Sequence, residues 1–288
     1  MKFANSQVQF QSWHYALMSA EVPAGRVRGL ELFGHKLALF RGRRGALKCF
    51  TARCPHLGAS LAAGDVVGDD LRCAFHHWKF NGEGRCIEAP CLPGVPAARV
   101  RSWPVVERQG IVWVFNAAEP WFPVPQVAGL EDAMLVPQNP VVLAAHPSLV
   151  ACNGIDVQHY RAAHGLQFDE EPSVERLDDY RTEVRLRLVM PYRILHGLSG
   201  RVLPMTFTTW GPYLATGRIE VKDWLLGLIF TNRAHPRGTY NRTFLLLPRG
   251  RWVARALLQV MLWVGDRVYD GDRAILDGLD FRPNLTEA

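Results

Sequence analysis

Two pairs of cysteine and histidine lie in the first third of the chain, with sixteen residues between the pairs. They are Cys54 with His56 and Cys73 with His76. Two thiolates can bind one iron of a two-iron, two-sulfur cluster while two imidazoles bind the other iron. Histidine ligands raise the reduction potential and keep a second ring nitrogen for a proton or a hydrogen bond. The pattern therefore predicts a one-electron relay.

Zinc is the alternative occupant, because cysteine and histidine also form tetrahedral zinc sites. Zinc sites usually show C-x2-C or H-x3-H spacing. The pairs in this chain have the spacings C-x-H and C-x2-H, which favour the iron–sulfur cluster.

A second group of possible metal ligands is Asp156, His159 and His164, with the spacing D-x2-H-x4-H. Two neutral imidazoles and one carboxylate that leave coordination positions open are typical of mononuclear ferrous oxygenases. On an ideal helix, however, five residues turn the second histidine about 140° from the first. The helix must therefore deform or end near Gly165 for both rings to reach one metal. By itself, the motif would favour two histidines on a helix surface.

A further carboxylate could come from a helix near the C-terminus, which contains Asp266, Asp270, Asp272 and Asp277. Asp272 has apolar or aromatic neighbours one helical turn away on both sides: Val268, Tyr269, Ile275 and Leu276. These neighbours predict that Asp272 lies on an inward face, where a metal would offset the cost of burying a carboxylate. The neighbours of Asp270 and Asp277 at the same spacing favour solvated positions.

Turn residues divide the first part of the chain into short segments, which is typical of antiparallel hairpins. The expected strands are 36–41, 46–51, 99–107 and 111–115. Neighbouring hairpins would carry the two Cys/His pairs at their tips, so that side chains distant in sequence converge. The Pro-rich segment 119–125 ends this pattern and predicts a linker between domains at 8–117 and 118–288.

The second domain is predicted to be α+β. A helical segment near 154–163 precedes segment 183–190, in which valine and leucines alternate with arginines, as in a sheet with one face in water. Further strands are expected over 205–210, 215–221, 224–231 and 242–247, followed by a long helix that ends near Leu279.

The 288 residues carry a net charge of +6 without a long basic run, which argues against a nucleic-acid-binding surface. No apolar run approaches the roughly 18 residues of a membrane span, and no signal region precedes the fold. Segment 252–264 is expected to be an amphipathic helix that packs on the core. The cysteines outside the two pairs are expected to be thiols in the reducing cytoplasm, with Cys152 as a small buried apolar residue.

Segments 54–60 (CPHLGAS) and 73–78 (CAFHHW) resemble the two cluster loops of Rieske proteins. Ala59 and Phe75 stand where the Rieske subunits of respiratory complexes have disulfide cysteines, so the loops are similar to the oxygenase type. His77 departs from the family, which usually has glycine there. If the position requires positive φ, histidine has a conformational cost. The residues at family positions are Pro55, Gly58 and Trp78.

Both constellations together resemble the large (alpha) subunit of Rieske non-heme iron oxygenases. The resemblance implies an antiparallel β Rieske domain followed by a helix-grip-like α+β catalytic domain. It implies a [2Fe-2S] cluster on Cys54, His56, Cys73 and His76, and a mononuclear Fe(II) on His159, His164 and Asp272. Asp156 would then be a catalytic bridge between an iron-ligand histidine and a cluster histidine, His76, of the neighbouring subunit in a head-to-tail homotrimer.

The same resemblance implies an oxidoreductase that uses O2 and electrons from a separate NAD(P)H-dependent reductase or ferredoxin. No G-x-G-x-x-G turn for a nucleotide is present in the chain. The expected reaction is hydroxylation, oxidative demethylation or desaturation of a small, largely apolar organic substrate; ring dihydroxylation uses the same machinery. The alternative is a Rieske ferredoxin-like electron carrier with an appended ligand-binding domain, which would hold about two irons per chain instead of three.

Overall fold

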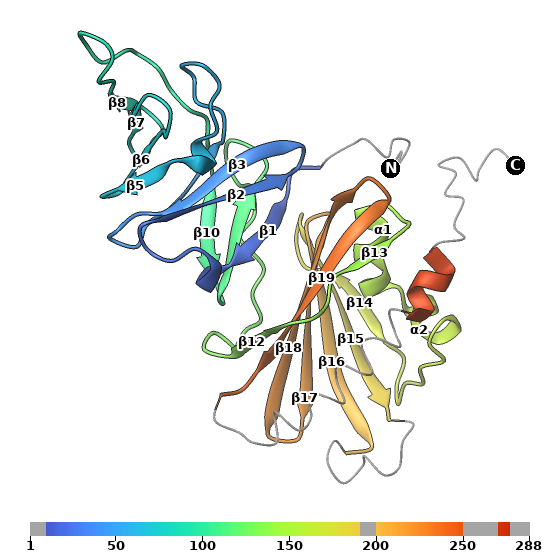
Figure 1. The fold of residues 1–288 in the computed structure, drawn as a ribbon. Coiled ribbons are helices and arrows are strands. Elements are labelled where there is room, and N and C mark those ends of the chain that lie inside the picture. The colour runs from blue at the N-terminus through green and yellow to red at the C-terminus, as the bar shows by residue number, and fades with distance from the viewer. Residues whose placement is uncertain (1–9, 191–199, 250–269, 277–288) are drawn as a thin grey trace, which may run out of the picture. The chain divides into compact units, whose positions relative to one another are not determined.

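The computed structural model describes residues 10–190, 200–249 and 270–276, which belong to two compact units (Figure 1). One unit comprises Gln11–Val124, and the other comprises Pro125–Ala288 together with Met1–Phe10. The domain limits 8–117 and 118–288 remain a prediction.

The 11–124 unit contains three antiparallel sheets. The first has the order β1 (Trp13–Met18), β11 (Ile111–Phe115), β10 (Val105–Arg108). The second has the order β2 (Arg26–Leu32), β3 (His35–Arg41), β4 (Leu47–Thr51), β9 (Ser102–Trp103). The third has the order β5 (Asp65–Val67), β6 (Asp70–Arg72), β7 (Lys79–Phe80), β8 (Cys86–Glu88). Short 3-10 helices lie at Ser19–Glu21 and Leu61–Ala63.

Two apolar clusters fill this unit. One joins β3 and β4 to the third sheet and includes Phe40, Phe50 and Phe80, all fully buried. The other lies between the first and second sheets and contains Leu37, Leu39 and Trp103. Residues on both faces of β3 are buried because the strand has a cluster on each side, which explains its continuous apolar run.

The expected hairpin of 36–41 and 46–51 is confirmed by β3 and β4. The strand expected over 99–107 is instead divided into β9 and β10. Pro104 lies at the break, and proline has no N–H to continue a hydrogen-bonded ladder.

The second unit is built on one antiparallel sheet with the order β12-β19-β18-β17-β16-β15-β14, and β13 also pairs with β19. The strands are β12 (Met134–Pro137), β13 (Val141–Leu143), β14 (Ser173–Arg176), β15 (Arg181–Val189), β16 (Val202–Trp210), β17 (Leu214–Val221), β18 (Trp224–His235) and β19 (Gly238–Leu247). This arrangement confirms the α+β class. The alternation in β15 gives buried Val184 and Leu186 on one face, with Arg185 exposed on the other.

Three short helical segments follow β13: α1 (Pro147–Cys152), the 3-10 helix η3 (Asn153–Ile155) and α2 (Val157–Ala162). Contacts of α1 with β18 and of η3 with β15 and β16 place them on the apolar face of the sheet. Residues 270–276 are helical and lie beside α2 (Figure 1). The rest of the expected C-terminal helix, and the expected helix 252–264, lie outside the described residues.

Two expectations about burial were wrong. Cys152 is exposed at the end of α1, because α1 turns directly into η3 there. Ile275 is also exposed, at 42 %, whereas Leu276 is buried. Within the described ranges, no helix has the length and apolarity that a membrane span requires.

Candidate functional site

The first Cys/His pair lies in a closed loop after β4. The backbone N–H of Cys54 donates to the carbonyl of Ala59, and the N–H of Gly58 donates back to the carbonyl of Cys54, both at 2.9 Å. A bridge between Arg53 and Ser60 closes the base of the loop. The loop is therefore held by its own backbone, which leaves the side chains of Cys54 and His56 available.

The second pair lies at the tip of the β6–β7 hairpin and repeats this hydrogen-bond pattern. The N–H of Cys73 donates to the carbonyl of Trp78 at 2.9 Å, and the N–H of His77 donates to the carbonyl of Cys73 at 3.2 Å. His77 and Gly58 thus occupy equivalent positions, and both have positive φ, +55° and +79°. The expectation that a histidine at position 77 has a conformational cost applies in this structure.

The four side chains divide into a buried thiol pair and a more accessible imidazole pair. Cys54 and Cys73 are each 2 % exposed. Burial raises the pKa of the Cys54 thiol to about 11, against a hydrogen bond from the backbone of His56 that lowers it. Both cysteines are free, and the rings of His56 and His76 lie 4.7 Å apart. Two buried thiols and two neighbouring imidazoles fit the donor set of a Rieske cluster.

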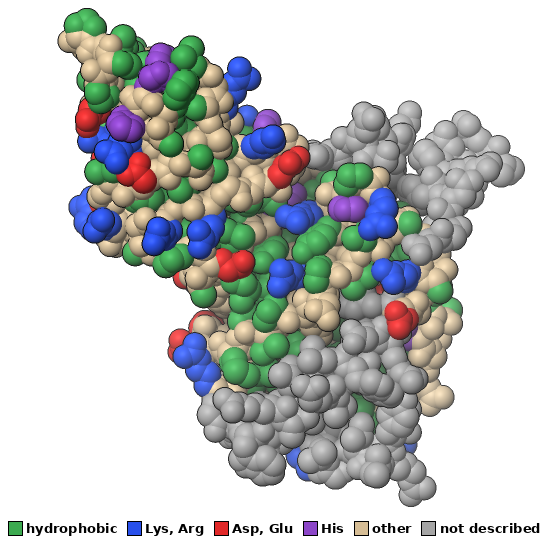
Figure 2. All heavy atoms as spheres, in the orientation of Figure 1, with side chains coloured by type: hydrophobic (Ala, Val, Ile, Leu, Met, Phe, Trp, Pro, Cys, Tyr) green, Lys and Arg blue, Asp and Glu red, His purple; other side chains and the backbone are tan. Residues whose placement is uncertain are grey.

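Apolar side chains surround these loops at the surface. Leu57 follows His56 and is 67 % exposed, and Phe75 precedes His76 and is 61 % exposed. Figure 2 shows hydrophobic and histidine side chains together at the end of the unit that carries β5–β8.

In the second unit, α2 positions His159 and ends before His164. Asp156 begins the helix as its N-cap, and its carboxylate accepts a hydrogen bond from the N–H of His159 at 3.0 Å. The helix ends at Ala162, and Gly165 has φ +61°. His164 therefore lies beyond the last helical residue, which removes the 140° conflict between the two histidines.

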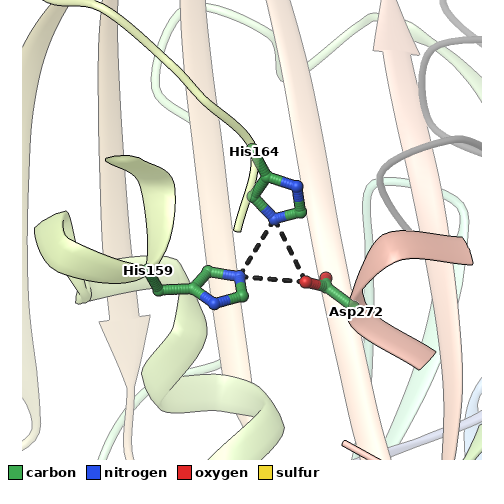
Figure 3. Close-up of side chains that lie close together, drawn as sticks. All are labelled: His159, His164 and Asp272. Carbon is green, nitrogen blue, oxygen red and sulfur yellow. Dashed lines mark hydrogen bonds and ion pairs between the residues drawn. The ribbon is translucent and has the colours of Figure 1, made fainter. Parts of the chain in front are cut away.

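Three donor atoms meet between α2, the segment that follows it and the helix at 270–276 (Figure 3). The Nε2 atom of His159 lies 2.9 Å from Oδ1 of Asp272, and that of His164 lies 3.1 Å from the same oxygen. The two Nε2 atoms are 3.0 Å apart. The three side chains are only 10–13 % exposed.

These distances match one face of an octahedral metal site. Ligands about 2.1 Å from a metal and at right angles are about 3.0 Å apart, whereas a tetrahedral angle would separate them by about 3.4 Å. Oδ1 of Asp272 is buried and makes no contact with hydrogen-bond geometry among the described residues. An oxygen in this situation requires a cation or a proton, so the donor set fits a divalent metal.

The structure separates the two neighbouring aspartates as the sequence suggested. The side chain of Asp272 points at the histidines (Figure 3), whereas Asp270 is exposed. Gly271, between them, approaches the ring of His164: a Cβ there would lie 3.8 Å from Cε1.

Asp156 is outside this group of donors. It is exposed, and of its carboxylate oxygens Oδ1 caps α2. This capping role was not predicted from the sequence, although an aspartate three residues before a predicted helical histidine is a recognisable N-cap signal.

Two further residues beside the sites were not identified from the sequence. Tyr160 is buried below His159, where its hydroxyl donates to the carbonyl of Gly154 at 2.7 Å. Burial, and then the carboxylates of Asp272 and Asp156, raise the pKa of Tyr160. Cys91 accepts a hydrogen bond from Trp78. No spacing signal could have shown this contact.

Comparison with known proteins places these loops in a family. The sequence profile of the Rieske [2Fe-2S] domain matches residues 12–104. Cholesterol 7-desaturase nvd of Bombyx mori is 34 % identical over 157 residues, which are 53 % of this chain and 35 % of that protein. The oxygenase component of 3-ketosteroid-9-alpha-monooxygenase of Rhodococcus rhodochrous is 34 % identical over 125 residues, 41 % of this chain and 32 % of that protein.

The aligned region spans about a third of the length of these curated relatives. A solved structure of dicamba monooxygenase bound to dicamba matches over 96 % of this chain and 89 % of that chain, with a TM-score of 0.67 and 19 % identity. At this identity, the match shows a shared fold across both units.

Proposed function

Because this chain contains a Rieske [2Fe-2S] domain and is homologous to the oxygenase components of Rieske systems, we propose that it is a Rieske non-heme iron oxygenase. The observation that carries the proposal is the group of His159, His164 and Asp272, which a simple electron carrier would not need. A Rieske ferredoxin-like carrier remains the alternative that the experiment below tests.

In the 11–124 unit, we assign Cys54 and Cys73 to one iron of the cluster and His56 and His76 to the other. When bound, the cluster supplies one electron at a time. The loops contribute a rigid backbone, and the buried thiols lose their protons when they bind iron.

In the second unit, we assign His159, His164 and Asp272 as the ligands of a mononuclear Fe(II), which supplies the chemistry of O2 activation. Three protein ligands would hold the iron and leave it accessible to O2. The hydroxyl of Tyr160 fixes α2 to η3 by its hydrogen bond to the carbonyl of Gly154, and α2 carries His159.

The substrate is proposed to be a small, largely apolar organic molecule. The sheet face that packs on Tyr160 and α2 carries Val184, Leu186, Met205 and Phe207. An apolar sheet face beside the metal donors limits water near the metal. The relatives named for cholesterol and ketosteroid oxidation agree with this class. Hydroxylation, oxidative demethylation and desaturation are the reactions we propose.

Asp156 is proposed to link two subunits of a homotrimer. Its Oδ1 accepts from His159, and Oδ2 has no protein partner among the described residues. The residue is exposed, so a ring N–H of His76 from a neighbouring chain could donate to it. This contact would connect a cluster ligand of one chain with the backbone of an iron ligand in the next.

Electrons are proposed to come from a separate NAD(P)H-dependent reductase or ferredoxin. Residues 11–124 contain fourteen Lys and Arg against nine Asp and Glu, whereas Pro125–Ala288 has eighteen of each. A basic cluster-bearing unit favours an acidic donor. A cytoplasmic location is supported by the six cysteines, which are all free thiols.

Metal and sulfide analysis tests the function. Purified protein should contain about three irons and two acid-labile sulfides per chain, as one cluster plus one iron require. Asp272→Ala should retain the cluster, lower the iron content to about two and abolish substrate oxidation. Cys54→Ala should lose the cluster and keep about one iron, because the ligand sets belong to separate units.

Asp270→Ala is the matched control, since it removes an exposed carboxylate two residues away on the same helix. It should leave the metal content unchanged. Wild-type protein with two irons and two sulfides would support the electron carrier instead. Loss of iron in Asp270→Ala but not in Asp272→Ala would refute the ligand assignment.

A further inference from the structure

The indole of Trp78 lies flat against the imidazole of His56. Their ring centroids are 4.5 Å apart, and their planes differ by only 4°. The other ring contacts of the two ligand histidines are inclined: His56 and His76 meet at 67°, and Phe75 and His76 meet at 46°. The stack therefore covers one face of His56. Since Trp78 belongs to the second cluster loop and His56 to the first, it also joins the loops.

One hydrogen bond fixes the plane of this indole. Nε1–H of Trp78 donates to Sγ of Cys91 at 3.2 Å. Cys91 follows β8 in a turn in which the N–H of Leu92 donates to the carbonyl of Ala89. Rotation of the indole out of the stack would break this bond. Trp78 is buried, whereas Cys91 is exposed, so the thiol lies between the covered ring and solvent.

We propose that Cys91 is a positioning residue for the iron–sulfur cluster: its thiol holds Trp78 against His56 and thereby sets the reduction potential. The inference rests on the proposed assignment of His56 as a cluster ligand. It concerns Cys91, which binds neither the cluster nor a substrate and acts only through the indole.

The direction of the effect follows from charge. Reduction adds one negative charge to the cluster, and water stabilises the more highly charged state. Solvent exposure and groups around the ligands are among the factors that set the potential of such clusters. An indole held over His56 excludes water from that face, so it disfavours the reduced state. Release of the indole should make the cluster easier to reduce.

The test is the midpoint potential of the complete protein, measured by redox titration of cluster absorbance or EPR. Cys91→Ala should make reduction at least about threefold more favourable, roughly 28 mV from the 59 mV per tenfold change of a one-electron couple. Cys91→Ser keeps an acceptor and should shift the potential less. Cys152→Ala removes the other exposed cysteine, which lies in the other unit, and should cause no shift.

A double-mutant cycle shows whether the thiol acts through the indole. Trp78→Phe keeps an aromatic ring without the N–H, so adding Cys91→Ala to it should have no further effect. Alkylation of Cys91 by iodoacetamide in the Cys152→Ala protein gives a measurement on a chain that folded with its thiol intact. Alkylation should raise the midpoint potential of the Cys152→Ala protein. It should have no effect when Cys91 is also replaced by alanine.

An unchanged potential in Cys91→Ala would overturn the inference. The inference would also be overturned if Cys91→Ala shifted the midpoint potential equally in the wild type and in Trp78→Phe. Absence of a reducible cluster from the wild-type protein would instead overturn the proposed function, which makes the two failures distinguishable.

Discussion

At the level of single residues, His77 is the position where this chain departs from the usual Rieske loop. The departure places a residue with a Cβ in left-handed backbone. Its φ of +55° corresponds to +79° at Gly58 in the other loop. Left-handed backbone costs about 1–2 kcal/mol for a residue with a Cβ, although histidine tolerates it better than most residues. The second loop therefore carries a conformational cost that the first loop avoids.

Replacing His77 with glycine should relieve this cost. Glycine also loses about 0.5–1 kcal/mol through the greater freedom of the unfolded chain, so His77→Gly should change the free energy of unfolding by zero to about +1.5 kcal/mol. His77→Val should lower it by about 1–2 kcal/mol, because β-branched residues are least suited to positive φ. Denaturant titration followed by cluster absorbance measures both variants. Greater stability of the valine variant would contradict the assigned conformation.

Cys49 gives a pH dependence at the same scale. It is fully buried between β3 and β9, and burial raises the pKa of its thiol. Because the folded-state pKa exceeds the unfolded value of about 8.5, the contribution of this thiol is complete below that pH. This contribution to stability is lost progressively as the pH rises above the unfolded-state pKa.

The stability of the 11–124 unit should therefore fall less steeply with rising pH in Cys49→Ala than in the wild type. At neutral pH this variant should be less stable, because the substitution leaves a small cavity. Midpoints of urea unfolding between pH 7 and 10 provide the measurement. Cys91→Ala, which removes an exposed thiol of the same unit, is the control. Parallel pH profiles for wild type and Cys49→Ala would show that this thiol is not responsible.

At the level of elements, α2 is a short helix whose position depends on its N-cap. Six residues cannot form a stable helix alone, so the Asp156 cap and the buried Tyr160 must hold it in place. Asp156 therefore has two separable properties, a cap that any short polar acceptor can supply and a charge that only a carboxylate supplies.

Asp156→Asn should keep the cap, the iron and a reducible cluster, but it should slow electron delivery to the iron site. Asp156→Ala should lose the cap as well, at a cost of about 1 kcal/mol, and should weaken iron binding through His159. Single-turnover kinetics on pre-reduced protein separate these effects. Product formation by Asp156→Asn at the wild-type rate would remove Asp156 from the electron route and reduce it to a helix cap.

At the level of the whole molecule, each unit contains all the residues of one proposed ligand set. The cluster residues all lie in Gln11–Val124, and the three metal donors all lie in Pro125–Ala288. A variant can therefore lose one centre and keep the other. If the cluster of one chain serves the iron of the next, as proposed for the trimer, two such defective chains can complement each other.

Mixed oligomers of Cys54→Ala and Asp272→Ala should recover substrate oxidation, although neither variant is active alone. In a mixed head-to-tail trimer, one directed interface in three joins an intact cluster to an intact iron site, so about a third of wild-type activity is expected. Co-expression with two affinity tags isolates the mixed species, and light scattering gives its mass. No recovery in a mixed trimer would place electron transfer within one chain.

The sequence by itself determined the residue types, and with them most of the chemistry. Cys54, His56, Cys73 and His76 could be predicted as cluster ligands because a cluster requires particular donors at particular spacings, and spacing within a loop is a local property. The strands were also local, because alternation in β15 and turns around β3 and β4 are present in the chain. Pro104 is also a local signal, and it explains why the expected strand over 99–107 is divided.

Only the tertiary structure decided which distant atoms meet. Asp272 is more than a hundred residues from His164, and the sequence offered four aspartates for one position. Packing of the 270–276 helix beside α2 selected one of them by direction and burial. The exposure of Ile275 and Cys152, and the contact from Trp78 to Cys91, were likewise set by neighbours from other segments. Periodicity describes a segment in isolation, whereas burial and hydrogen-bond partners depend on what the fold places beside it.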